Sequence, residues 1–316
     1  MRGPKIPTSG DATVDLDGRA VRVTNLHKPF WPELGLTKGD LIRYYVAVAP
    51  WLLPHLRDRA MVMRRYPHGW RGEFFFMKRA PTPRPPWIRT CAIDHGSKGV
   101  IDLPVIDDLA SLAWVINLGC IDLNPWYARC DDVDRPDYLH FDLDPGSAPF
   151  AKVLEAALYL NEALTALKMP TYVKTSGSKG VHVYVPVVRG PTQHEVWTVA
   201  KAIAVALAAR APALVTAEYT VARRPKGRVL LDYNQNAWSR TLASIYSVRP
   251  TRHASVSMPV TWRELERGVA IEDFRLDNAP ARLARRGDLW GKVLPAARGR
   301  FDLDRLRERA AAAANA

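Results

Sequence analysis

The sequence predicts a mixed α+β fold, in which short apolar strands alternate with amphipathic helices along 316 residues. Residues 138–145 (YLHFDLDP) form an apolar run that is closed by two acids and a proline, as is typical of a buried strand. Residues 150–169 (FAKVLEAALYLNEALTALKM) repeat apolar side chains at helical spacing. With 47% hydrophobic and 24% charged residues, the chain has a globular composition and the length of one large or two ordinary domains.

The first elements follow from local signals. Residues 1–11 are expected to be disordered, and a hairpin should follow, with Asp17 and Gly18 in the turn. Thr37 is a candidate helix cap, with Asp40 three residues later. The apolar positions of this helix share one face: Leu41, Tyr44, Tyr45 and Val48.

Residues 61–80 (MVMRRYPHGWRGEFFFMKRA) mix basic side chains, which neutralise phosphates, with aromatic ones, which stack on bases. Neighbouring residues of a strand point to opposite faces, so we expect at least one of Phe74, Phe75 and Phe76 to lie in the core. Residues 81–87 form a proline-rich surface loop, and residues 105–119 are predicted to form a helix.

The second half of the chain alternates strands, turns and helices. Residues 171–187 are predicted to form a strand, a glycine turn and a strand, and Thr192 opens a helix through Arg210. Residues 213–233 are predicted to form a hairpin around a basic turn, and residues 241–250 (TLASIYSVRP) a further strand. Thr261 caps a short helix, residues 279–296 are helical and Arg-rich, and the tail from Arg305 is expected to fray.

The formal net charge of +13 predicts a polyanionic partner, most simply nucleic acid. Lys28 and Lys38 bracket the start of the first helix and could hold a phosphate, or they are ordinary surface lysines. No apolar run reaches membrane-spanning length and no signal peptide is seen, so we expect no membrane partner. The cysteines lack metal-binding spacing, which predicts reduced thiols in the cytoplasm and no zinc site: Cys91, Cys120 and Cys130.

Asp142 and Asp144 lie two residues apart on one predicted strand and therefore project to the same side. Close carboxylates repel one another unless a proton or a cation lies between them, and Mg²⁺ or Mn²⁺ prefers such oxygen ligands. A solvated pair of acids before a Pro-Gly turn would give the same pattern. Asp232 closes a second strand, and three carboxylates can hold two cations.

The turn at residues 176–180 (SGSKG) has the composition of a phosphate site. Its glycines, including Gly180, let backbone N–H groups approach an anion, Lys179 supplies charge, and Ser176 supplies a hydroxyl donor. His182 follows on the next strand and could reach the same phosphates. Each feature alone suits an ordinary hairpin, but with the acids they predict a nucleoside triphosphate held beside metal ions for in-line attack at its α-phosphate.

The runs FDLDP, SGSKGVHVYVP, VLLDYNQN and YSVRP together resemble the primase-polymerase domain of bacterial non-homologous end-joining ligase D and its stand-alone relatives, within the archaeo-eukaryotic primase superfamily. The resemblance extends from about Asn25 to about Leu289. It implies an RRM-like antiparallel catalytic sheet fused to an N-terminal α/β module. We expect an N-terminal module at residues 12–130, a catalytic module at 131–250, a C-terminal helical extension at 251–300 and a tail at 301–316. No ligase or nuclease motif is seen, which predicts a separate polymerase polypeptide.

The resemblance also implies a role for individual residues. The catalytic acids and metal ligands would be Asp142, Asp144 and Asp232. The nucleotide would be bound by Ser176, Lys179, Gly180, His182, Arg249 and Asn124. DNA would be bound by Lys28 and Lys38 at a 5′-phosphate, by Phe75 and Phe76 on the template strand, and by Arg65 and Lys78. Asn124 is a departure, since relatives often carry a histidine before the Pro-Trp pair, and asparagine cannot carry a proton.

The function implied is a template-directed nucleotidyltransferase that fills short gaps or extends broken ends in DNA repair, with two Mn²⁺ or Mg²⁺ ions and a preference for ribonucleotides. The expected partners are DNA with a gap or end bearing a 5′-phosphate, NTP or dNTP, a separate DNA ligase and an end-binding protein, in the nucleoid-associated bacterial cytoplasm. Two alternatives stay open: a haloacid-dehalogenase-like phosphatase and a non-catalytic DNA-end-binding module. Gly146 disfavours the phosphatase, whose family prefers Thr or Val two residues after the second Asp.

Overall fold

The computed structural model describes residues 4–293 and 299–304, and its contacts divide the chain into two compact units. Unit 1 consists of Met1–Asp131, Leu242–Met258 and Ala270–Asp288, and unit 2 of Asp132–Thr241, Pro259–Val269 and Leu289–Ala316. The three modules expected from the sequence differ from this division after Thr241. Instead of forming one C-terminal extension, the chain from there on contributes to both units in turn.

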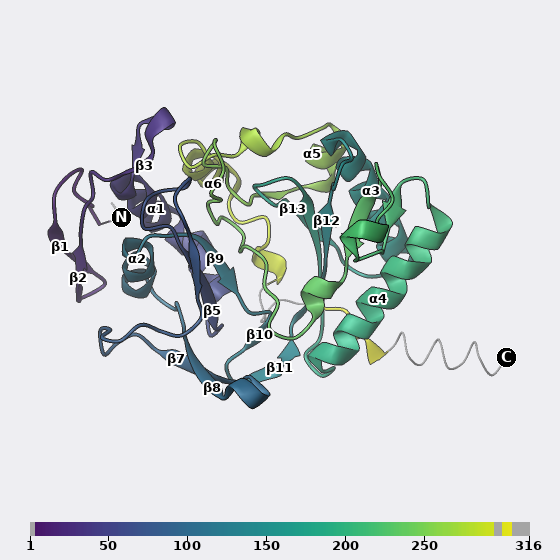
Figure 1. Cartoon of the computed structure of the whole chain (residues 1–316), viewed down its shortest axis with the longest axis horizontal. Coiled ribbons are helices and arrows are strands. Elements are labelled where there is room, and N and C mark those ends of the chain that lie inside the picture. Colours follow the sequence, from purple (N-terminus) through teal and green to yellow (C-terminus); the bar gives the residue numbers. More distant parts are fainter. Residues whose placement is uncertain (1–3, 294–298, 305–316) are drawn as a thin grey trace. The chain divides into compact units, whose positions relative to one another are not determined.

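Unit 1 is built mainly from the first part of the chain, labelled in Figure 1. Its strands are β1 (Ala12–Leu16), β2 (Arg19–Val23), β3 (Pro29–Trp31), β4 (Leu36–Thr37), β5 (Met61–Arg65), β6 (Phe75–Met77), β7 (Thr90–Asp94), β8 (Val100–Pro104), β9 (Cys120–Pro125) and β10 (Ala128–Arg129). Its α-helices are α1 (Lys38–Leu56), α2 (Leu109–Asn117) and α6 (Ala279–Arg286), and its short 3₁₀ turns are Pro32–Leu34, Gly96–Lys98 and Ile271–Asp273.

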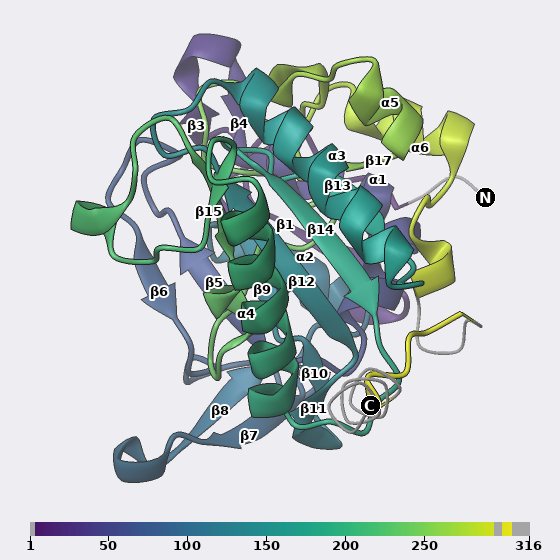
Figure 2. The ribbon, with the colours of Figure 1, turned by 90° about the vertical axis from the view of Figure 1, so that its right-hand side faces the viewer.

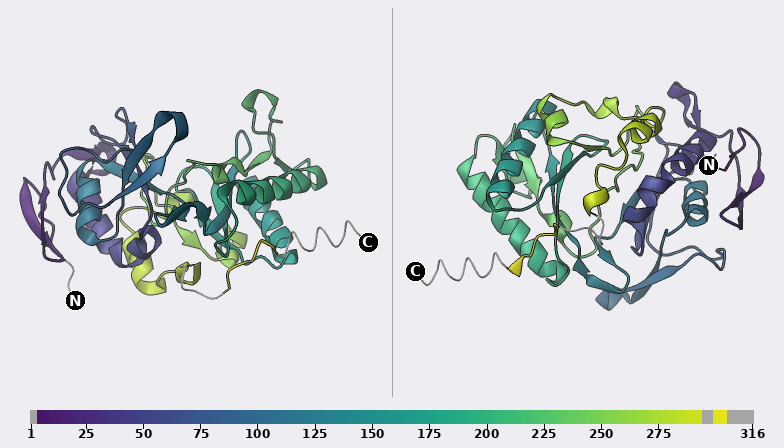
Figure 3. Two further views of the ribbon diagram at one scale, coloured as in Figure 1. Left: turned by 90° about the horizontal axis from the view of Figure 1, so that it is seen from below. Right: turned by 180° about the vertical axis from the view of Figure 1, so that it is seen from behind.

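Local sequence signals determine where the first elements of unit 1 begin and turn. Asp17 and Gly18 both have positive φ, and their turn pairs β1 with β2 in the predicted hairpin. Figure 3 shows this hairpin close to the N-terminus. The Thr37 hydroxyl accepts from the backbone N–H of Asp40, and the Asp40 carboxylate accepts from that of Thr37. The predicted apolar face of α1 is buried: Leu41, Tyr44, Tyr45 and Val48.

The segment predicted to be disordered is partly described. Residues 1–3 lie outside the described residues, but Ile6 is buried in unit 1. The Pro7 carbonyl accepts a hydrogen bond of 2.9 Å from the Arg43 guanidinium. Residues 4–11 therefore pack on unit 1.

Unit 2 contains one six-stranded sheet with two long helices. Its strands are β11 (Asp132–Pro136), β12 (Tyr138–Asp144), β13 (Tyr172–Thr175), β14 (Val181–Pro186), β15 (Val215–Thr216), β16 (Val229–Asp232) and β17 (Pro259–Val260). Its helices are α3 (Phe150–Ala166), α4 (Gln193–Arg210) and α5 (Trp262–Glu266), with 3₁₀ turns at Val221–Arg223, Asn234–Asn236 and Gly291–Val293. The strands of the sheet follow the order β15-β16-β12-β14-β13-β17.

Strand β12 lies inside this sheet, where it pairs antiparallel with both β14 and β16. Its apolar residues Leu139, Phe141 and Leu143 are fully buried. Figure 2 shows α3 and α4 lying across one face of the sheet. Because side chains alternate along a strand, His140, Asp142 and Asp144 point to the face opposite to Leu139, Phe141 and Leu143.

Two strand predictions in this half of the chain are wrong. Residues 213–233 do not form a hairpin, because β15 pairs parallel to β16, with Val215 opposite Val229, and the connection between them includes the 3₁₀ turn Val221–Arg223. Residues 241–250 form no regular strand: Tyr246 has a positive φ, and Val248 makes only an isolated bridge to Val256. The apolar side chains there are buried, but their backbone groups bond in an irregular pattern.

The helix predictions are closer to the structure. Thr192 caps α4 and Thr261 caps α5, each through a reciprocal bond with a glutamate three residues later. The segment predicted at residues 279–296 is helical only over α6, and residues 294–298 lie outside the described residues, as does the tail from Arg305. Within the described part of the chain, none of the helices combines the length and the apolar character that crossing a membrane requires.

Candidate active site

The candidate active site of unit 2 starts from two carboxylates on neighbouring strands. Asp142 on β12 lies directly opposite Asp232 on β16 in the antiparallel register, so their side chains occupy the same face of the sheet. Asp144, two residues along β12, projects to this face as well. The structure thus brings together the three acids that the sequence marked at the ends of two strands.

The three acids differ in their surroundings. Asp232 is buried, and burial raises the pKa of its carboxyl, with Asp142 acting in the same direction. Its two oxygens accept hydrogen bonds from the Asn234 backbone at 2.8 Å and the Gln235 side chain at 2.9 Å. The Asp144 side chain is half exposed, and its carboxylate accepts from the Gly146 backbone at 3.0 Å. The carboxylates therefore lie on one face of the sheet but differ in exposure, since Asp232 is buried and Asp144 is half exposed.

A row of titratable side chains extends across the sheet from these acids. His182 on β14 lies opposite Asp142, with 3.3 Å between His182 Nε2 and Asp142 Oδ1, and Lys174 on β13 lies opposite His182. Lys174 is fully buried, and its ammonium lies 5.9 Å from the ring centroid of Tyr184. Burial, with the nearby His182 and Lys174, lowers the pKa of His140 to about 3, so His140 is neutral at physiological pH.

The turn between β13 and β14 is closed by its own serine. Ser176 Oγ accepts hydrogen bonds from the backbone N–H groups of Ser178 at 3.1 Å and Gly180 at 3.0 Å. A Cβ on Gly180 would lie 2.2 Å from the Leu143 carbonyl oxygen, so glycine is needed for the close approach to β12. The Lys179 side chain is exposed. This packing holds the turn beside the strand that carries Asp142.

The donor set suits a hard divalent cation, since Asp142, Asp144 and Asp232 offer oxygen atoms only. Within residues 4–293 and 299–304, no three His, Cys, Asp or Glu side chains converge closely enough to form a preformed metal site. The assignment of a divalent cation to these acids therefore rests on their oxygen ligands and on the register that places Asp142 opposite Asp232.

Three predicted DNA contacts form a cationic cluster in unit 1. Lys38 is only 5% exposed, and its Nζ donates a 2.7 Å hydrogen bond to the Thr24 carbonyl. Burial and the nearby Lys28 lower the pKa of Lys38 to about 8, and Arg65 acts in the same direction. Asp11 opposes this shift. Lys38 is buried and Lys28 and Arg65 are half-buried, and such a cluster of like charges favours an anionic ligand, which would relieve the repulsion.

The aromatic run of unit 1 is exposed, and the prediction of a core phenylalanine is wrong. Phe74, Phe75 and Phe76 are 46%, 44% and 60% exposed. Only Phe75 and Phe76 belong to the short strand β6, which lies at the edge of the three-stranded sheet β6-β5-β9. Instead the Arg64 guanidinium lies 4.4 Å from the Phe74 ring centroid, and that of Arg65 lies 5.2 Å from the Phe75 centroid.

The remaining predicted residues also belong to unit 1. Asn124 is buried on β9, Lys78 follows β6 and is partly exposed, and Arg249 lies in the irregular segment. Sequence reasoning missed Asp122, a fully buried acid whose Oδ2 lies 3.5 Å from Arg249 Nε. It also missed Lys174. In both cases the available signal was a charged residue inside an otherwise apolar strand.

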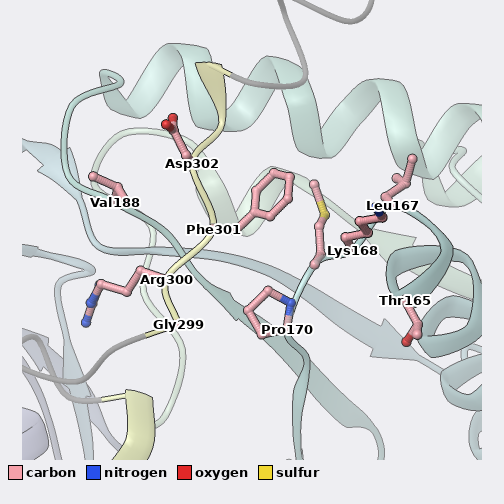
Figure 4. Close-up of a pocket in the computed structure, with 10 residues that line it drawn as sticks. Thr165, Leu167, Lys168, Pro170, Val188, Gly299, Arg300, Phe301 and Asp302 are labelled. Atoms are coloured by element: carbon pink, nitrogen blue, oxygen red, sulfur yellow. The ribbon is translucent and has the colours of Figure 1, made fainter.

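A cavity of about 610 Å³ in unit 2, which none of the three acids lines, is shown in Figure 4. It is lined by Thr165, Leu167, Lys168, Met169, Pro170, Val188 and residues 299–302. It contains none of the predicted site residues, and the chain on both sides of residues 299–302 includes segments outside the described residues. We assign no function to it.

The sequence matches that of a known family of DNA-repair polymerase domains. The sequence profile described as "LigD, primase-polymerase domain" matches residues 37–290. The multifunctional non-homologous end joining protein LigD of Mycolicibacterium smegmatis is 34% identical over 272 residues, and the bifunctional LigD of Bacillus subtilis is 30% identical over 269 residues. These alignments cover 85% and 84% of this chain, but the chain spans only 35% and 43% of those relatives.

A solved structure shows the same likeness in three dimensions. The polymerase domain from Mycobacterium tuberculosis ligase D, in complex with DNA, matches with a TM-score of 0.82 at 31% identity. The match covers 88% of this chain and 99% of that domain. The protein therefore has the mixed α/β fold of a polymerase domain. It belongs to the LigD primase-polymerase domain family.

Proposed function

We propose that this protein is a template-directed nucleotidyltransferase that fills gaps or extends ends during DNA repair by non-homologous end joining. The observation that carries the proposal is the register that sets Asp142 opposite Asp232, with Asp144 on the same face, in a member of this family. The structural relative was solved in complex with DNA. A DNA partner also agrees with the net charge of +13.

In the proposed reaction, the 3′-oxygen of a primer attacks the α-phosphorus of a nucleoside triphosphate, and pyrophosphate leaves. Asp142, Asp144 and Asp232 would hold two Mg²⁺ or Mn²⁺ ions, which when bound neutralise charge on the attacking and leaving oxygens. We propose that Ser176, Lys179, Gly180 and His182 bind the triphosphate, and that Arg249 and Asn124 also bind the nucleotide. Positioning and charge neutralisation supply most of the acceleration.

The residues proposed to contact DNA all belong to unit 1. Lys28 and Lys38 would bind the 5′-phosphate at a gap, because an anion there would offset the burial and the nearby Lys28 charge that lower the pKa of Lys38. Phe75 and Phe76 are exposed, as a base-stacking surface requires. Arg65 and Lys78 would bind the backbone. The preference for ribonucleotides, the RRM-like character of the unit 2 sheet, and a DNA ligase and an end-binding protein as partners are further parts of this proposal.

Primer extension on a gapped duplex with a 5′-phosphate tests the proposal. NTPs and dNTPs are compared in Mn²⁺ and in Mg²⁺, for the wild type and for Asp142→Asn. Glu162→Gln, an exposed acid on α3, is the matched control. We expect Asp142→Asn to abolish incorporation while DNA binding, measured by fluorescence anisotropy, is retained.

Two outcomes would contradict the proposal. No incorporation by the wild type in either metal, with DNA binding retained, would favour the non-catalytic end-binding module. Incorporation by Asp142→Asn at the wild-type rate would remove the carboxylates from the mechanism. Membership in the LigD family gives no support to the haloacid-dehalogenase alternative, and a para-nitrophenyl phosphate assay on the same samples tests it directly.

A further inference from the structure

Asp122 is a carboxylate in the middle of a buried strand of unit 1. Its side chain is fully buried on β9, directly opposite Arg64 in the register with β5. Burial raises the pKa of Asp122, whereas the charges of Arg249 and Arg64 lower it. A buried carboxylate is costly unless it is paired, so the two arginines are needed to keep it in place.

Both arginines use the same oxygen of this carboxylate. Asp122 Oδ2 accepts a 3.1 Å hydrogen bond from the Arg64 guanidinium and lies 3.5 Å from Arg249 Nε. The two arginine side chains remain 19% and 16% exposed, whereas the Asp122 side chain is fully buried. One buried anion thus sets the orientation of two cations that come from distant parts of the chain.

We expect the two arginines to have different roles. Arg249 is the residue that we expect to contact the triphosphate. The Arg64 guanidinium lies under the exposed aromatic surface, 4.4 Å from the ring centroid of Phe74, 5.3 Å from that of Tyr66 and 5.5 Å from that of Phe76. Arg64 therefore supports the surface on which we expect the template to stack.

We propose that Asp122 is a positioning residue that aligns Arg249 for the nucleotide and Arg64 for the template-stacking surface. The inference rests on the proposed polymerase function and deepens it. Since one oxygen serves both arginines, loss of its charge weakens nucleotide binding and template stacking together. A change at either arginine alone affects mainly one of the two properties.

The test is Asp122→Asn in the full chain, which keeps the volume of the side chain and removes its charge. We expect the KM for the nucleotide to rise on the order of tenfold, with a smaller change in kcat, because hydrogen bonds to charged groups have about this effect. We expect a similar loss of affinity for a template carrying 2-aminopurine, and less quenching of this base by stacking. Arg249→Lys should then cost less in the Asp122→Asn background than in the wild type.

Asp107→Asn is the matched control, because Asp107 also binds an arginine, Arg89, in unit 1 but touches neither Arg64 nor Arg249. Comparing the two variants at equal distance below their Tm separates positioning from general destabilisation. If Asp122→Asn does not fold, Asp122→Glu keeps the charge and displaces it by one methylene, and both readouts should still shift together.

The inference is overturned if the folded variant matches Asp107→Asn in nucleotide KM and in 2-aminopurine quenching. It is also overturned if only one of the two properties changes. Failure of the polymerase proposal itself gives a different result, because the wild type would then neither incorporate nucleotides nor show a measurable KM.

Discussion

If Lys38 binds a 5′-phosphate as proposed, its buried ammonium should make that recognition depend on pH. Lys38 is 5% exposed, and burial, with Lys28 beside it, lowers its pKa from 10.5 to about 8. This difference corresponds to about 3 kcal/mol against the charged form in the folded protein. If Lys38 binds the phosphate, affinity must fall as the pH rises through about 8, because the neutral amine no longer offers a charge to the phosphate dianion.

Fluorescence anisotropy with a gapped duplex, with and without the 5′-phosphate, measures this dependence. With a pKa of about 8, the protonated fraction of Lys38 falls from roughly nine tenths at pH 7 to roughly one tenth at pH 9. The preference for phosphorylated DNA should therefore fall by about tenfold over this range. Lys38→Arg, which stays charged, should keep the preference nearly constant, and Lys28→Arg should retain the wild-type profile.

The reasoning is refuted if the wild-type preference does not change between pH 7 and pH 9, or if Lys38→Met leaves the preference intact. The same pKa has a consequence for stability without DNA. Between pH 8 and 10.5 the unfolded chain binds more protons at Lys38 than the folded chain does, so the free energy of unfolding rises with pH in this window. Lys38→Met should remove that part of the rise in a denaturant titration.

Three further changes have defined outcomes. Phe76→Ala should weaken single-strand template binding by about 1–3 kcal/mol in anisotropy and change the Tm little, since the ring is 60% exposed; equal affinity would exclude stacking. Gly180→Ala should lower stability by about 1–3 kcal/mol in urea titrations and reduce incorporation, because its Cβ meets the Leu143 carbonyl, whereas Gly190→Ala has open space and should be neutral. Thr192→Ala should cost about 1 kcal/mol through loss of the α4 cap, and Thr192→Ser should restore it; an unchanged midpoint would contradict the capping role.

Helix starts were predictable because both partners of each cap are local. Thr37, Thr192 and Thr261 each bond to an acid three residues later, as their spacing indicates. The turn at Asp17 and Gly18 is similar, since two residues with positive φ suffice to reverse the chain there. In these cases all interacting residues lie within four positions of one another, so the local sequence was sufficient to predict the local structure.

Strand direction and pairing depend on partners that the local sequence does not contain. An apolar run before and after a basic turn fits a hairpin, yet β15 and β16 are parallel because the connection between them is long enough to cross over. Residues 241–250 alternate like a strand, but the positive φ of Tyr246 breaks the extended backbone. The pattern correctly indicated burial and wrongly indicated regular pairing.

The same limit applies to the candidate site. The sequence marked Asp142, Asp144 and Asp232 as acids at strand ends, but the register that sets Asp142 opposite Asp232 appears only in the sheet. The partnership of Asp122 with Arg64 and Arg249 joins three chain segments, so spacing could not reveal it. A lone acid within the apolar run CIDLNP was the available clue, because such a charge needs a partner.

The discontinuous makeup of unit 1 has a consequence for biosynthesis and for truncation. Its first 131 residues leave the ribosome long before Leu242–Met258 and Ala270–Asp288, which complete the unit. Until then the Tyr44 hydroxyl lacks its acceptor, the Tyr246 carbonyl at 2.7 Å, and the Tyr45 hydroxyl lacks the Val248 N–H at 3.0 Å. A fragment ending near residue 131 would keep these buried hydroxyls without those bonds, so a nascent chain of that length should remain protease-sensitive until its later segments emerge.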